Sequence, residues 1–133
     1  MRSLLGETLE LASETGINPT CLEVLVYGSP PGKRNFGVFQ YVFGRIGRDG
    51  KWQTLCGRIL LQPRRGATDR EIVHMFAHEL GHLRDFQDNR ACCLMSRNEK
   101  EWRAQEFAEE ILDQWARRLL QRPRTAAVRF ELQ

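Results

Sequence analysis

The sequence predicts an α+β fold in which a small antiparallel or mixed sheet packs against helices. The order of the elements supports this class, because one helical pattern is followed by three strand-like segments and then by two helical patterns. Size and composition support it as well. The chain of 133 residues favours one domain over residues 1–133, and its 41% of hydrophobic residues suffices for a buried core.

The first half of the chain contains one predicted helix and three predicted strands. The helix covers residues 3–15, where leucines recur with a period of about 3.6 residues, and Gly16 ends it. Residues 22–27, 36–46 and 51–62 are rich in β-branched, aromatic and other apolar residues, as strands are. A turn with the sequence GRDG separates the last two strands, which predicts that they pair as a hairpin.

Two helices are predicted in the second half of the chain. Thr68 and Glu71 form a capping box at the start of a helix that covers residues 69–86. A similar pair, Asn98 and Glu101, predicts the start of a long C-terminal helix.

The long helix is expected to end near residue 120, because Pro123 cannot continue it. Residues 123–133 then form a short strand or a loose tail. The sequence shows no internal repeat and no low-complexity segment that would indicate a second domain.

Charge and cysteine content narrow the classes of protein. The net charge of +3 is too small to indicate nucleic-acid binding, and the arginines near residues 64–65 and 117–129 are interpreted as solvated surface. The N-terminus lacks the apolar run of a signal peptide, and no segment is long enough to span a membrane. The four cysteines show no CxxC spacing, so we expect free thiols in a reducing, cytoplasmic compartment.

All three histidines lie in one segment, VHMFAHELGH, at residues 73–82. His78 and His82 are four residues apart, so on a helix they share a face and can bind one Zn²⁺. Glu79 is rotated by about 100° from His78 around the helix. From there it can act as the general base toward a water molecule activated by the metal, without being a ligand itself.

His74 shares the face of the other two histidines but is not predicted to bind the same ion. Ligands at three successive turns would span about 12 Å along the helix axis, which is too far for one metal ion. We interpret His74 as a partly buried, hydrogen-bonded residue one turn from the site.

A catalytic zinc site needs a third protein ligand, and without a fourth histidine this must be a carboxylate or a thiolate. Asp88 would fit the spacing HExxHxxGxx[HD], but that motif needs a sharp turn where the chain has Asp85 instead of glycine. The last helix offers several glutamates. Glu101 stands out because small and apolar residues surround it, and Gln105 one turn later could support a zinc-binding histidine.

The segment AHELGH followed by EWRAQEFAEEIL resembles the gluzincin pattern, in which HExxH is followed by E-x-x-A-[ND]-x-F-A on the next helix. The chain is most similar to the ImmA/IrrE-type metallopeptidases over residues 57–112. Gln105 stands where that family prefers Asn or Asp, and Arg103 stands where it often has Glu.

The resemblance implies a minimal zincin-like fold. In such a fold a small three- to four-stranded sheet packs against the HExxH helix and a long C-terminal helix, and residues 57–62 form the edge strand of the sheet. It also implies that His78, His82 and Glu101 bind Zn²⁺ and that Glu79 is the general base.

The function expected from these residues is that of a zinc-dependent endopeptidase. Its substrate would be a protein or peptide that pairs as an extended strand with residues 57–61, and the family analogy implies a transcriptional repressor as one such substrate. Two alternatives stay open: a zincin-fold protein that binds or regulates without catalysis, and a structural zinc site closed by Cys92 or Cys93.

Overall fold

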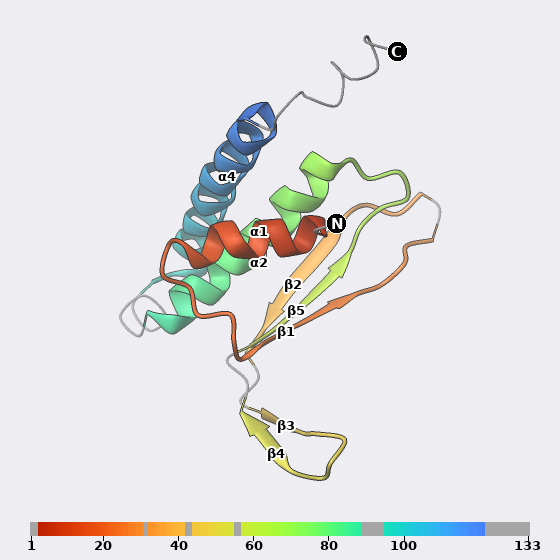
Figure 1. Cartoon of the computed structure of the whole chain (residues 1–133), viewed down its shortest axis with the longest axis vertical. Coiled ribbons are helices and arrows are strands. Elements are labelled where there is room, and N and C mark those ends of the chain that lie inside the picture. The colour runs from red at the N-terminus through yellow and green to blue at the C-terminus, as the bar shows by residue number, and fades with distance from the viewer. Residues whose placement is uncertain (1–2, 31, 42–43, 55–56, 89–94, 122–133) are drawn as a thin grey trace, which may run out of the picture.

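The computed structural model describes residues 3–30, 32–41, 44–54, 57–88 and 95–121. Within these ranges the chain forms an α+β fold with a small mixed sheet and a long C-terminal helix, as the sequence predicts (Figure 1). No helix in the described ranges is both long enough and apolar enough to cross a membrane. The tail predicted at residues 123–133 lies outside the described residues.

The three described helices are α1 (Leu4–Ser13), α2 (Asp69–Gln87) and α4 (Arg97–Gln121). Their bounds agree with the sequence predictions to within a few residues. At the start of α1 the hydroxyl of Ser3 accepts a hydrogen bond from the backbone N–H of Gly6 at 3.0 Å.

The start of α4 differs from the prediction, because Ser96 caps the helix and the pair Asn98 and Glu101 does not. The hydroxyl of Ser96 accepts from the backbone N–H of Glu99 at 3.2 Å, and its carbonyl accepts from that of Lys100 at 3.1 Å. The carboxylate of Glu101 is therefore not used at the helix end and faces α2 instead.

The main sheet contains β1 (Leu22–Val26), β5 (Gly57–Gln62) and β2 (Phe36–Gln40), in that order. β5 is parallel to β1 and antiparallel to β2. The expectation that residues 57–62 form the edge strand is therefore wrong. Hairpin signals identify β2 as one neighbour of β5, but they do not reveal that the earlier strand β1 pairs with its other side.

A second, two-stranded sheet contains β3 (Gly44–Ile46) and β4 (Trp52–Thr54), so each of the two predicted hairpin strands is divided between two sheets. The predicted pairing is nevertheless present, because the residue numbers of each pair add to 98 in both antiparallel ladders. In Figure 1 the β3–β4 ribbon projects away from the helices. Ile46 and Trp52 on this ribbon are 71% and 64% exposed.

The core lies between the helices and one face of the sheet. α2 is central, because it packs against β2 and β5 on one side and against α4 on the other, while α1 contacts both helices (Figure 1). The largest fully buried apolar side chains come from the three helices and β5: Leu11, Ile59, Leu61, Val73, Phe76, Leu80, Leu83, Phe107 and Ile111. This arrangement fixes α2, which carries the three histidines.

Cys21 differs from the expectation of free thiols, because it is disulfide-bonded. The other three cysteines, Cys56, Cys92 and Cys93, lie outside the described residues. Structural disulfides are uncommon in a reducing compartment, which is the location that we expected from the sequence.

The start of α2 agrees with the prediction and adds an ion pair to it. The hydroxyl of Thr68 accepts from the backbone N–H of Glu71 at 3.2 Å. The Glu71 carboxylate accepts from Arg64 Nε and from Asn35 Nδ2, both at 2.8 Å, so it joins two loops to the helix. The hydrogen bonds from Arg64 and then Asn35 lower the pKa of Glu71 to about 2.

We expect the substitution Glu71→Gln to lower the melting temperature at pH 7. The pKa of Glu71 is lower in the folded protein than its ordinary value of 4.5, so its carboxylate stabilises the fold above about pH 4.5 and loses this effect as the pH falls toward 2. The difference in melting temperature between the two proteins should therefore shrink over that range. Thermal unfolding followed by circular dichroism measures it, with the exposed Glu110→Gln as control, and a difference independent of pH would contradict the expectation.

Candidate metal centre

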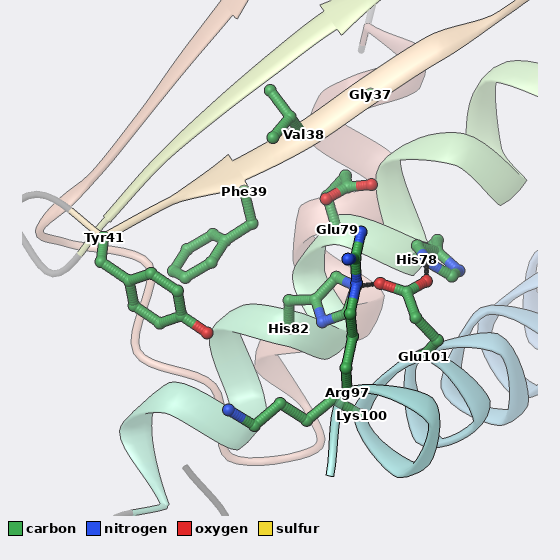
Figure 2. A pocket seen from close by; sticks show the side chains of 10 residues that line it. All are labelled: Gly37, Val38, Phe39, Tyr41, His78, Glu79, His82, Arg97, Lys100 and Glu101. Atoms are coloured by element: carbon green, nitrogen blue, oxygen red, sulfur yellow. Dashed lines mark hydrogen bonds and ion pairs between the residues drawn. The ribbon is translucent and has the colours of Figure 1, made fainter. Parts of the chain in front are cut away.

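Two helices bring together the three residues that the sequence proposes as metal ligands. His78 and His82 come from α2, one turn apart, with ring centroids separated by 5.1 Å. Glu101 comes from α4 and lies between them: its two carboxylate oxygens are each 3.0 Å from one of the two Nε2 atoms (Figure 2). One ligand atom from each residue lies within 4.8 Å of the other two.

The donor set fits a zinc ion. Two imidazole nitrogens and one carboxylate oxygen are the ligands of many catalytic zinc sites, which keep a further position open. The side chains of His78 and His82 are only 20% and 14% exposed, so water competes little for their nitrogens. Burial lowers the pKa of His82, which favours the neutral imidazole that metal binding requires.

The close contact of α2 and α4 depends on Gly81. A Cβ atom at this position would lie 2.9 Å from Cα and 3.3 Å from Cβ of Ala104, so only glycine fits at this crossing. Ala104 itself is fully buried. Glu101 lies one turn before Ala104 and therefore reaches the two histidines, which lie on the neighbouring turns of α2.

Glu79 lies beside the three candidate ligands but is not one of them. Its side chain is buried, at 7% exposure, against β2. Burial raises the pKa of Glu79 to about 7; the charge of His78 and the backbone N–H of Phe39 oppose this effect, and Glu101 adds to it. A carboxyl group whose pKa lies near neutrality can both accept and donate a proton.

The interpretation of His74 holds, but the expected partner of Gln105 is different. The amide nitrogen of Gln105 lies 3.1 Å from Nε2 of His74 and 3.3 Å from a carboxylate oxygen of Glu109. The Glu109 carboxylate only accepts, so the group that faces it is the NH₂ group of Gln105. This group only donates, so His74 accepts the second hydrogen bond at Nε2. Gln105 thus supports His74, and not His78 or His82 as expected.

The alternative ligand Asp88 is not brought to the site. α2 continues through Asp85 without the turn that the alternative motif needs, and Asp88 caps its C-terminus. Six residues of helix rotate Asp88 by about 240° from His82, away from the histidine face. Asp85 has a different role: it is buried and accepts hydrogen bonds from Arg103 of α4 at 3.1 and 3.2 Å.

A cavity of about 560 Å³ opens above the candidate ligands. Its walls include several residues that sequence reasoning did not assign to a site (Figure 2), namely Gly37, Val38, Phe39 and Tyr41 of β2 and its end, and Arg97 and Lys100 of α4. The glycine within an apolar strand was the available signal, because such a residue marks a close approach. A Cβ at Gly37 would lie 3.2 Å from Cγ of Met75 and 3.3 Å from Cγ of Glu79.

Comparison with known proteins gives no match, whether with protein-family models, curated proteins or solved structures.

We expect the purified protein to bind one Zn²⁺ per chain. Each of the substitutions His78→Ala, His82→Ala and Glu101→Ala should weaken zinc binding by more than about 100-fold, because the loss of an outer partner alone can reach that scale. Competition with a chromogenic chelator measures the affinity. His74→Ala and Glu99→Ala are matched controls that should retain the metal, and zinc binding that survives all three ligand substitutions would exclude this centre.

The substitution Gly81→Ala tests the helix crossing. The added methyl group has to displace the backbone of α4 at Ala104, so we expect the free energy of unfolding to fall by about 1–3 kcal/mol. Zinc affinity should fall with it, because Glu101 moves away from the histidines. Gly28→Ala is the control, since a Cβ there meets no atom within 4 Å. Unchanged stability and zinc affinity in Gly81→Ala would show that the crossing does not position the site.

Proposed function

We propose that the chain is a zinc-dependent endopeptidase that hydrolyses a peptide bond of a protein substrate. The observation that carries this proposal is the meeting of His78, His82 and Glu101 beside the buried carboxyl of Glu79, below an open cavity. Two imidazoles, one carboxylate and a separate general base are the chemical groups that a metallopeptidase needs.

In this proposal His78, His82 and Glu101 hold the ion. When bound there, Zn²⁺ polarises the peptide carbonyl and lowers the pKa of water toward neutrality. Glu79 takes a proton from the attacking water on its carboxylate and gives it to the nitrogen of the leaving amine, so the carboxylate is regenerated. The burial of Glu79 against β2 suits this role, because burial raises the pKa of its carboxyl group to about 7.

The substrate is expected to pair with β2 and not with residues 57–61, because β5 is the central strand. In the part of the chain that the structure describes, β2 has a strand partner only on the β5 side. Its other edge borders the cavity through Gly37, Val38 and Phe39. An extended peptide that adds to this edge passes the candidate ligands with its backbone, which is the general mode of β-augmentation.

We also propose that the substrate is a protein, with a transcriptional repressor as the example that the gluzincin resemblance implies. The cytoplasmic location expected from the sequence stays a prediction. The disulfide at Cys21 argues against a reducing compartment. Alkylation of thiols during cell lysis, followed by mass spectrometry of the peptide that contains Cys21, separates a cytoplasmic from an oxidising location.

Two alternatives differ from this proposal, one in the open position on the metal and the other in the role of Glu79. A structural zinc site closed by Cys92 or Cys93 involves residues outside the described ranges, whereas the cavity above the three ligands favours an accessible ion. A zincin-fold protein that only binds its partner would retain the ion and the cavity but would not use Glu79.

We expect zinc-loaded wild-type protein to cleave unfolded casein or a mixed library of quenched fluorescent peptides. Glu79→Gln should lower kcat/KM by at least about 100-fold, the lower end of the contribution of a general base, because the amide cannot take the proton. The variant should keep its zinc and its melting temperature. Glu106→Gln, on the same helix as Glu101, is the control. If Glu79→Gln cleaves as fast as the wild type, or if zinc-loaded wild type cleaves no substrate, hydrolysis is not the function.

A further inference from the structure

The cavity above the candidate metal centre carries two cationic side chains that the proposed mechanism does not use. Arg97 and Lys100 lie three residues apart in the first turn of α4, so they share a helix face. Figure 2 shows both side chains extending from α4 into the cavity. Lys100 is half-buried, while Arg97 is exposed.

Within the described residues, neither cation has a carboxylate partner. The ion pairs that the described residues form with one another involve other arginines or the histidines of the site. Among the described residues that line the cavity, the two carboxylates are Glu79 and Glu101, and Glu101 already contacts both imidazoles. Arg97 and Lys100 therefore have donors to offer to a molecule that enters the cavity.

The charge balance of the cavity also favours an anionic ligand. The described part of its lining contains two cations, Arg97 and Lys100, and two carboxylates, Glu79 and Glu101, so the formal charges of these four side chains cancel. A divalent ion at the centre adds two positive charges, and these belong in any account of the site. The loaded cavity is then positive, which complements an anionic ligand.

We propose that Arg97 and Lys100 bind a carboxylate of the substrate, so that the site takes peptides with an acidic group near the bond to be cleaved. This inference rests on the proposed function, because it assumes that a peptide occupies the edge of β2. A peptide on that edge runs along one wall of the cavity, and α4 forms the wall across from it. An acidic side chain of the peptide that points toward α4 meets the two cations, whereas one that points toward β2 meets the aliphatic side chain of Val38.

The carboxylate can come from an Asp or Glu side chain or from the C-terminus of the peptide. Three fluorescein-labelled hexapeptides separate these sources. One has a central Glu and an amidated C-terminus, the second has Gln in place of Glu, and the third is the Gln peptide with a C-terminal carboxylate. Binding is measured by fluorescence polarisation with zinc-loaded Glu79→Gln, so that no peptide is cleaved.

At low ionic strength we expect at least one peptide with a carboxylate to bind about five- to tenfold more tightly than the neutral peptide, the scale of two partly exposed ion pairs. Preference for the Glu peptide identifies a side chain as the source, and preference for the peptide with the C-terminal carboxylate identifies the chain end. The preference should decrease as salt is added.

Added to that background, the double substitution Arg97→Gln and Lys100→Gln should remove the preference and leave the affinity for the neutral peptide unchanged. The matched control, Arg65→Gln with Arg117→Gln, removes two exposed charges outside the cavity and should keep it. The two single substitutions at Arg97 and Lys100 repeat the test if the double variant does not fold. Equal binding of all three peptides, no measurable binding, or a preference that survives the double substitution would overturn the inference.

The outcomes also separate this inference from the proposed function. If carboxylate peptides bind selectively and wild-type protein cleaves no substrate, recognition stands and hydrolysis fails. If the wild type cleaves peptides with equal kcat/KM whether or not they carry a carboxylate, hydrolysis stands and the role of Arg97 and Lys100 fails.

Discussion

The candidate site depends on the contact between α2 and α4 at Gly81 and Ala104. At this contact Gly81 has no side chain and Ala104 has only a methyl group, so the two helix backbones lie close together next to the histidine face of α2. The same crossing lets Glu101 reach across to two imidazoles and places Arg103 beside the buried Asp85. Further along α4, Phe107 and Ile111 are buried and belong to the apolar core.

A second glycine has the corresponding role on the sheet side of α2. Gly37 lets β2 approach the helix so closely that the side chain of Glu79 is enclosed between them. The two glycines therefore act on opposite sides of one helix: Gly81 sets the distance from the histidines to the carboxylate of α4, and Gly37 sets the environment of Glu79. Neither residue takes part in the chemistry itself, but each determines where a reactive side chain lies and how much water surrounds it.

The parts of this structure that could be predicted from the sequence are those determined by local periodicity. The spacing of His78 and His82 suffices to place both on one face of a helix, and Thr68 suffices to start that helix. Contacts between elements were harder to predict. β5 became the central strand because β1 joined it from a distance in sequence, and Gln105 contacts His74 because α4 crosses α2 at an angle that spacing alone does not reveal. The approach of Glu101 was anticipated from the small and apolar residues around it in the sequence and from the gluzincin pattern.

The β3–β4 ribbon keeps the register of the main hairpin, and within the described ranges the helices do not pack against it. Its conformation is therefore determined by its own turn and cross-strand pairs, and the packing of the core does not depend on its length. Paired insertions or deletions, one residue in each strand, would preserve the register at β2 and so the wall of the cavity. This makes the ribbon the part of the fold where evolution can vary length and surface chemistry at little cost to the centre, and where a peptide tag can be inserted with the least disturbance.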